Sequence, residues 1–197
     1  AAGSATARRF LSAALLSAAG TSRPPRRARL DSLLARLAGA DPVVATLAGA
    51  RVEAWPDQIL VTREMPRGGL PPLEIPRRGV SVWDGRFEIE ARDLDLRIVP
   101  AAGLMARLEP ADRKEILGLS PELRRLQPIN SPDEGTAGQS RPVLASTVAR
   151  VSPLVRSRLR AACGLITHEA DIDDGRVAPG LRASYVGIER PIAAAGL

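Results

Sequence analysis

The most regular apolar pattern of this chain lies near its start, where leucines recur with a helical period at Leu30, Leu33, Leu34 and Leu37. Positions i, i+3, i+4 and i+7 share one face of an α-helix, so the pattern predicts an amphipathic helix with that face buried. We expect this helix to span residues 25–38 and to end at Gly39. Pro25 suits its first turn, because an N–H group there has no partner within the helix to lose.

A second apolar stripe predicts a helix over residues 5–19, and its expected inward residues are Phe10, Leu11, Ala14, Leu15 and Ala18. The two helices would then form a hairpin. An alternative is an export signal over residues 7–19, where Arg8 and Arg9 precede a short apolar run. That run is shorter than the roughly 20 apolar residues that cross a bilayer, so the hairpin is the preferred interpretation.

After residue 42 the apolar positions alternate with a period of two, which predicts strands. We expect strands over Ala45–Ala54 and Gln58–Glu64, joined by a turn at Trp55-Pro56-Asp57. Further along, Leu94, Leu96 and Ile98 alternate in the same way and predict another strand that Pro100 ends.

Asp84-Gly85 predicts a type I′ hairpin turn, because both central residues of that turn need positive φ. Pairing outward from this dipeptide places Val82 opposite Phe87 and Val80 opposite Ile89, which would gather the apolar residues on one face. The same pairing places Trp83 opposite Arg86, where the two side chains could stack.

The rest of the chain predicts loops and short helices. Residues 66–79 read as a Pro/Gly-rich connecting loop, and residues 130–141 as a loop or disordered insert. Helices are expected over Pro110–Leu117, from an N-cap at Ser120, and from Ser152-Pro153 to a stop at Gly164. The tail from Thr167 shows a weak strand pattern.

These elements predict an α+β fold, with an N-terminal helical hairpin followed by a small antiparallel β-meander and short C-terminal helices. The expected organisation is a helical region with a basic helix at 1–42 and an α+β domain at 43–128. A flexible linker at 129–142 and a C-terminal helix and tail at 143–197 complete it.

The charge of the chain is concentrated in its first segment. Residues 1–40 hold seven arginines and one acid, Asp31, and so carry the whole formal net charge of +6, whereas the remaining 157 residues hold 21 charges of each sign. A basic segment of this kind is typical of proteins that contact nucleic acid or an anionic membrane surface. Lys114 is the only lysine, so a general preference for arginine is the competing explanation.

Four of these arginines crowd the start of the predicted basic helix: Arg23, Arg26, Arg27 and Arg29. A helix N-terminus already carries about half a positive charge, so cations there cost a few tenths of a kcal/mol unless an anion is bound. Phosphate is the anion that such an end accepts best. We therefore predict phosphate contacts for these arginines, with Arg77 and Arg78 as further backbone contacts; the alternative is a merely solvated face.

The composition excludes several kinds of site. A single cysteine, Cys163, permits no intramolecular disulfide and fits a reducing compartment, and with the single histidine, His168, it cannot assemble an ordinary zinc site. Gly68-Gly69 lacks the Lys-Ser/Thr of a P-loop, and Asp171, Asp173 and Asp174 lack the pattern of a calcium loop. We expect no metal site and no catalytic residue.

Six short segments form an ordered set of motifs along the chain: Gly20–Arg26, Leu30–Leu34, Ala45–Ala54, Ile59–Glu64, Val82–Phe87 and Leu117–Arg125. Taken in this order, they resemble the C-terminal half of bacterial tRNA(Ile)-lysidine synthases. In that family a Pro-Pro-Arg helix precedes a strand with a Thr-Leu-Gly-Gly type of motif. The likeness covers roughly residues 8–165.

The resemblance implies a role in tRNA processing. Enzymes of this family use ATP to adenylate C2 of the wobble cytidine of an isoleucine tRNA and then ligate lysine there. Their ATP-binding loop, Ser-Gly-Gly-x-Asp-Ser, is absent from these 197 residues. The resemblance therefore implies the tRNA-recognition portion of a cytoplasmic ligase, which would be inactive alone, with ATP, Mg and lysine expected only at a separate catalytic domain.

Two other functional classes stay open at this point. The chain could be a stand-alone nucleic-acid-binding or scaffolding module without catalysis, or an exported protein that uses residues 7–19 as its signal. Its first residue is Ala, which fits a fragment or a processed product equally well. We expect tRNA as a partner and no membrane.

Overall fold

The structure is a computed structural model that describes residues 2–131, 140–143, 147–165 and 186–189. These residues form two compact units. Unit 1 contains the described residues of 2–64 and 155–165 together with 186–189, and unit 2 contains those of 65–154. The chain therefore leaves unit 1 after Glu64 and returns to it at Val155. The segment limits expected after residues 42, 128 and 142 remain predictions.

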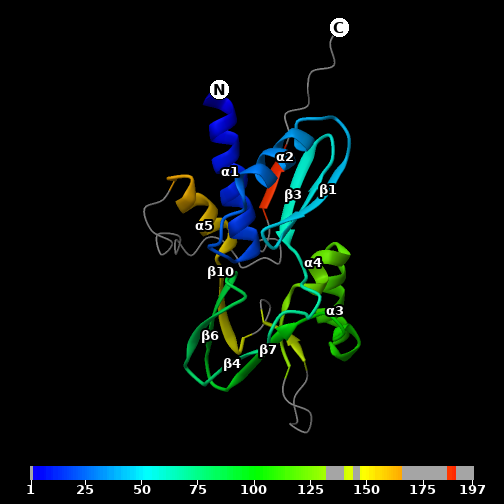
Figure 1. The fold of residues 1–197 in the computed structure, drawn as a ribbon. Coiled ribbons are helices and arrows are strands. Elements are labelled where there is room, and N and C mark those ends of the chain that lie inside the picture. The colour runs from blue at the N-terminus through cyan, green and yellow to red at the C-terminus, as the bar shows by residue number, and fades with distance from the viewer. Residues whose placement is uncertain (1, 132–139, 144–146, 166–185, 190–197) are drawn as a thin grey trace. The chain divides into compact units, whose positions relative to one another are not determined.

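Unit 1 contains three helices, α1 (Ala2–Ala19), α2 (Arg27–Leu37) and α5 (Val155–Ala162). Figure 1 shows α1 flanked by α2 and α5, and α1 contacts both. The predicted helical hairpin is thus confirmed. Helix α2 begins two residues later than expected, so Pro25 precedes the N-cap residue Arg26 instead of lying in the first turn.

The sheet of unit 1 is antiparallel, in the order β1-β2-β3-β11, and consists of β1 (Val43–Leu47), β2 (Ala50–Ala54), β3 (Gln58–Arg63) and β11 (Val186–Glu189). The single strand predicted over Ala45–Ala54 is wrong, because a tight turn divides it. Ala48 has φ 54° and Gly49 has φ 79°, the two positive values of a type I′ turn. The turn after Ala54 is confirmed: the Trp55 N–H donates to the carbonyl of Gln58 at 2.8 Å.

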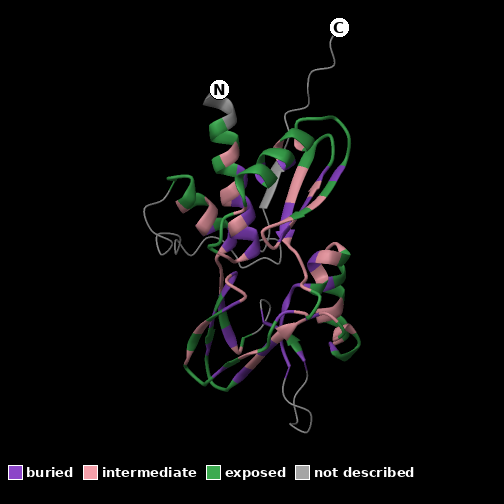
Figure 2. Ribbon diagram, in the orientation of Figure 1, coloured by how far each residue is buried: buried purple, intermediate pink, exposed green. Residues whose placement is uncertain are grey.

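The core of unit 1 lies between its helices and one face of this sheet. Helix residues Leu11, Ala14, Leu15 and Ala18 are buried as predicted, whereas Phe10 is 37% exposed and was wrongly placed inside. Figure 2 shows that the buried positions of α1 gather in its C-terminal half. Every second strand residue joins them, including Val43, Ala50, Val52, Ala54 and Val61. The core therefore follows both helical and strand periodicity.

Unit 2 is built from two antiparallel sheets and short helices. One sheet has the order β10-β6-β5, with β5 (Val80–Trp83), β6 (Phe87–Ala91) and β10 (Ala149–Pro153). The other has the order β4-β7-β8-β9, with β4 (Leu73–Ile75), β7 (Leu96–Pro100), β8 (Pro128–Asn130) and β9 (Arg141–Pro142). The helical elements are η1 (Met105–Arg107), α3 (Pro110–Leu117) and α4 (Pro121–Arg125). The predicted α+β class is confirmed.

The short helices of unit 2 follow their sequence signals. Helix α3 has the predicted bounds, and the Ser120 hydroxyl caps α4 by accepting the Leu123 N–H at 3.5 Å. The helix expected to open at Ser152-Pro153 was misplaced, since both residues lie in β10 and α5 begins at Val155. Its predicted stop is confirmed, because Gly164 adopts φ 72°.

Some expected loops contain strands, and others are outside the described residues. The segment 66–79 includes β4. Conversely, the strand predicted to include Leu94 begins later, because β7 starts at Leu96 and Leu94 is 41% exposed. Within the segment 130–141, Asn130 and Arg141 pair between β8 and β9, while residues 132–139 are not described. Of the tail, only β11 is described, and the three tail aspartates and His168 lie outside that range.

The register of the β5–β6 hairpin differs from the predicted one by one residue. Asp84 and Gly85 have the expected positive φ values of 50° and 63°, but Trp83 pairs with Phe87 and the loop also includes Arg86. A shift of one residue moves side chains to the other face of a strand. Trp83 is consequently buried, and Val80 and Val82 are 60% and 43% exposed.

The reason for this shift is the side chain of Arg86, which is fully buried. Its Nε lies 2.7 Å from Asp84 Oδ2, and its Nη2 donates to the carbonyl of Leu126 at 3.2 Å. The centre of its guanidinium lies 5.7 Å from the ring centroid of Trp83 and 5.0 Å from that of Phe87. The predicted stacking of Trp83 on Arg86 therefore occurs, in the interior instead of at the surface.

Candidate nucleic-acid interface

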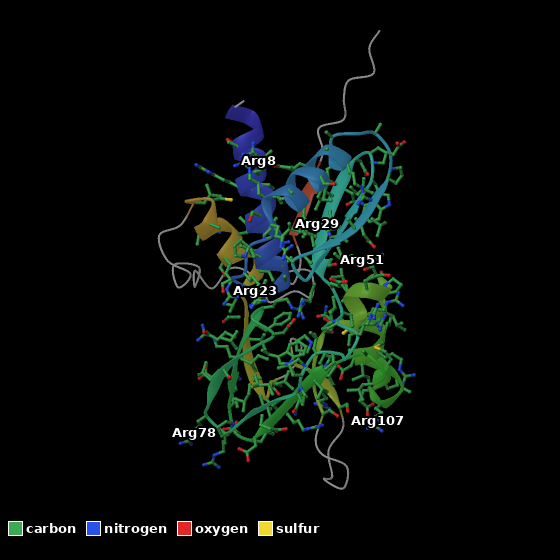
Figure 3. All side chains as sticks on the ribbon, viewed as in Figure 1. Arg8, Arg23, Arg29, Arg51, Arg78 and Arg107 are labelled. Atoms are coloured by element: carbon green, nitrogen blue, oxygen red, sulfur yellow. The ribbon has the colours of Figure 1, made fainter. Side chains whose placement is uncertain are left out.

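The predicted arginine cluster lies at the surface of unit 1, between α1 and the first turn of α2. All four of its side chains are exposed: Arg23, Arg26, Arg27 and Arg29. Figure 3 labels Arg23 and Arg29 on this unit. Exposure is a requirement for contact with a nucleic-acid backbone, and the cluster meets it.

The start of α2 offers an anion both cationic side chains and backbone N–H groups. Arg26 is the N-cap residue, and its side chain caps no N–H group of the helix. Its carbonyl accepts the N–H groups of Arg29 at 3.0 Å and Leu30 at 3.1 Å. No acid occupies the first turn. The helix therefore starts without the carboxylate or hydroxyl that usually stabilises this end.

Asp31 holds two arginines from different helices. Its Oδ1 lies 3.1 Å from Nε of Arg8 on α1, and its Oδ2 lies 3.8 Å from Nε of Arg27 one turn earlier on α2. The Asp31 side chain is 46% exposed, so these are surface ion pairs of modest energy. Asp31 links α1 to α2 and is the only acid in the described parts of the three helices of unit 1.

Helix α5 adds three arginines to the same unit, and sequence reasoning missed them. Arg156, Arg158 and Arg160 lie on a helix without any acid. Val155 and Leu159 of this helix enter the core of unit 1, and Arg156 and Arg160 are exposed. The sequence signal that could have found them is an arginine at every second position, next to Val155 and Leu159, whose spacing of four residues is that of a buried helix face.

The helices of the two units differ in charge. Those of unit 1 hold eight arginines and one aspartate, whereas α3 and α4 of unit 2 hold four basic and three acidic residues. The strands of unit 1 add no excess, because they hold two arginines, Arg51 and Arg63, and two glutamates, Glu53 and Glu189. Arg51 and Glu53 form an ion pair of 2.6 Å. Among the described helices and strands, the largest excess of positive charge thus lies in the helices of unit 1.

Arg77 and Arg78 lie in the other unit, in the connection between β4 and β5, and both are exposed. The Arg77 N–H donates to Oδ1 of Asp95 at 2.7 Å. The Gly79 N–H donates to the carbonyl of Pro76 at 2.7 Å and closes a turn in which Arg78 has φ 62°. The six predicted arginines therefore form two groups, one in each unit.

Other kinds of site find little support in the described residues. No group of His, Cys, Asp or Glu side chains among them could hold a metal ion, and none of their helices is long and apolar enough to cross a membrane. Gly68-Gly69 belongs to a turn closed by the Gly69 N–H and the Pro66 carbonyl at 2.9 Å. Cys163 is exposed after the end of α5.

Comparison with known proteins agrees with the resemblance drawn from the motifs. The chain is 38% identical over 169 residues to a tRNA(Ile)-lysidine synthase from Caulobacter vibrioides. The match covers 81% of this chain and 41% of that protein, so the chain spans less than half of its relative's length. No protein-family model matches the chain. No solved structure matches it either.

Proposed function

We propose that this chain is the tRNA-recognition portion of a tRNA(Ile)-lysidine synthase, which ligates lysine onto C2 of the wobble cytidine of isoleucine tRNA with ATP. The observation that carries the proposal is the 38% identity to such an enzyme over 81% of the chain. The match covers 41% of that relative, so we propose the ligation for the whole enzyme and tRNA recognition for the portion that this chain spans.

The arginines would act on the RNA backbone. Guanidinium groups bind phosphate oxygens through two parallel N–H donors, and each phosphate they neutralise releases condensed counterions. Arg23, Arg26, Arg27 and Arg29 are exposed on unit 1, and Arg77 and Arg78 are exposed on unit 2. Contacts of this kind fix the register of a tRNA without reading its bases. The wobble cytidine would then be presented to the catalytic domain, where ATP, Mg and lysine bind.

Binding of an isoleucine tRNA transcript to the 197-residue chain at several salt concentrations tests this proposal. We expect a steep fall of the binding constant with salt. Replacement of Arg26 and Arg27 by alanine should weaken binding and flatten the logarithmic salt slope by about one unit per lost phosphate contact. Binding by this double variant that equals the wild type would reject the cluster as a contact surface. Adenylation or ATP hydrolysis by the chain alone would contradict a purely binding role.

A general nucleic-acid-binding module is the second candidate, and the concentration of arginines in the helices of unit 1 favours it. Competition separates the two. A tRNA-specific portion should prefer isoleucine tRNA over duplex DNA of equal length, whereas a general module should bind both with similar affinity at the same salt concentration.

Burial of Leu11, Ala14 and Leu15 in the core of unit 1 supports a structural role for α1 over an export signal. A cytoplasmic location is part of this proposal. Intact residues 1–19 on the protein purified from the cytosol are the expected result.

A further inference from the structure

Helix α5 presents two exposed arginines, each one residue after a residue that contacts the core. Val155 is fully buried and Leu159 packs against the same core as residues of α1. Arg156 and Arg160 each follow one of these apolar residues and are exposed, four residues apart. Like charges at this spacing repel each other by a few tenths of a kcal/mol, and α5 carries no acid that could offset the repulsion. The arrangement becomes favourable when an anion binds along the helix.

We propose that Arg156 and Arg160 form a second phosphate-binding stripe, called here the α5 stripe, which contacts the tRNA backbone together with the Arg23–Arg29 cluster. This inference rests on the proposed function and deepens it. The two sets are more than 120 residues apart in the chain, yet α2 and α5 enter one core through Leu30, Leu33 and Val155. They therefore belong to a single body that can bind several phosphates without a change of shape.

The chemistry of α5 favours an RNA backbone over a membrane surface. A helix that lies on a membrane inserts its large apolar residues among the lipids. The corresponding residues of α5, Val155 and Leu159, are occupied by the core of unit 1. The exposed charged groups of α5 are the guanidinium groups of Arg156 and Arg160, which can bind successive phosphates along an RNA strand.

Three double variants of the 197-residue chain, each losing two positive charges, test this inference. They are Arg156→Gln with Arg160→Gln, Arg26→Gln with Arg27→Gln, and a control, Arg125→Gln with Arg141→Gln, at exposed positions of unit 2. The measurement is the dissociation constant for isoleucine tRNA at several salt concentrations. We expect the α5 variant to bind about tenfold more weakly at low salt, with a salt slope flatter by about two units. The control should stay within about threefold of the wild type, because loss of net charge alone acts weakly at a distance.

The outcomes separate this inference from the proposed function. Loss of binding in the Arg26/Arg27 variant, with an α5 variant that equals the control, overturns the α5 stripe and leaves the proposed function standing. Absence of salt-dependent tRNA binding by the wild type overturns both. Binding to vesicles that contain phosphatidylserine is measured for the same variants. If the α5 variant loses binding to these vesicles but binds tRNA like the wild type, the α5 stripe contacts membranes and the inference is overturned. If the Arg156→Gln/Arg160→Gln variant unfolds, Arg156→Lys with Arg160→Lys takes its place. Lysine keeps both positive charges, so this variant should retain most of the tRNA affinity. A loss of affinity of about tenfold despite the retained charges would contradict phosphate contact.

Discussion

Asp84 and Arg86 form an ion pair inside unit 2, with 2.7 Å between Oδ2 and Nε and side-chain exposures of only 7% and 0%. The guanidinium also lies near the rings of Trp83 and Phe87. Removal of one member of such a pair leaves a charge in a place that water cannot reach, which costs far more than the pair itself contributes. The hairpin loop thus depends on its own carboxylate.

We expect Asp84→Asn to lower the free energy of unfolding of unit 2 by about 3 kcal/mol. Asparagine tolerates the positive φ of this position, so the variant removes the charge without adding backbone strain. Urea unfolding in a Trp55→Phe background, where Trp83 is the remaining tryptophan, measures the change.

Glu74→Gln provides the control for this measurement, because the Glu74–Arg97 pair of 3.1 Å is at the surface, where Glu74 is 68% exposed. Its cost should stay below about 1 kcal/mol. An Asp84→Asn variant as stable as Glu74→Gln would show that the buried charge is compensated by other groups.

The turn between β1 and β2 predicts a second contrast. Gly49 has φ 79°, and a Cβ at this position would meet Nη1 of Arg63 at 2.8 Å. That nitrogen also donates to the Gly49 carbonyl at 2.9 Å. Gly49→Ala should therefore destabilise unit 1 by about 1–2 kcal/mol through strain and displacement of Arg63.

Gly68→Ala is the matched control, since nothing lies within 4 Å of its added Cβ and its φ is not positive. We expect its effect on thermal unfolding to be neutral or slightly stabilising. Equal melting temperatures for the two variants would contradict the assigned turn.

Arg78 is expected to show a conflict between stability and binding. It occupies a left-handed position, φ 62°, that favours glycine. Arg78→Gly should raise the free energy of unfolding by about 0.5–1 kcal/mol and remove one phosphate contact, which would flatten the salt slope of tRNA binding by about one unit. Arg67→Gly loses the same charge where φ is not positive, and should destabilise unit 2 instead. Unchanged tRNA affinity of Arg78→Gly would remove this residue from the interface.

Asp31 should oppose tRNA binding, because it pairs with Arg8 and Arg27 beside the arginine cluster. Asp31→Asn is expected to tighten tRNA binding about threefold at low salt and to change stability by less than about 1 kcal/mol. Asp57→Asn, an exposed position in the turn before β3, makes the same charge change away from the helices. A similar gain in affinity from both variants would show a general charge effect and contradict a local role of Asp31.

Local signals predicted local structure well. Leucine spacing located α2, and Ser120-Pro121 located the start of α4. The Asp84-Gly85 dipeptide located a turn but not its length, because the apolar pattern favoured a pairing that placed Val80 and Val82 on the same face as Phe87 and Ile89. What decided the register was the burial of Arg86, and a propensity argument assigns arginine to the surface. The Ala48-Gly49 turn was missed for a similar reason, since alanine rarely marks a position with positive φ.

The candidate site was only half visible in the sequence. A run of arginines within seven residues stands out along the chain, whereas α5 reaches the same unit through long-range packing of Val155. Periodicity says that a helix has an apolar face but does not say which partner covers it. The assignment of α5 to unit 1 therefore required the structure.

The position of Val155 in the core of unit 1 also has a consequence for synthesis on the ribosome. Residues 2–64 emerge first, but their core is filled only when Val155 arrives about ninety residues later. At about 5–20 residues per second, the part of α1 that contacts α5 stays without this partner for roughly 5–20 s while the strands of unit 2 emerge. A nascent chain of this protein thus passes through a period in which its first helices need protection from aggregation.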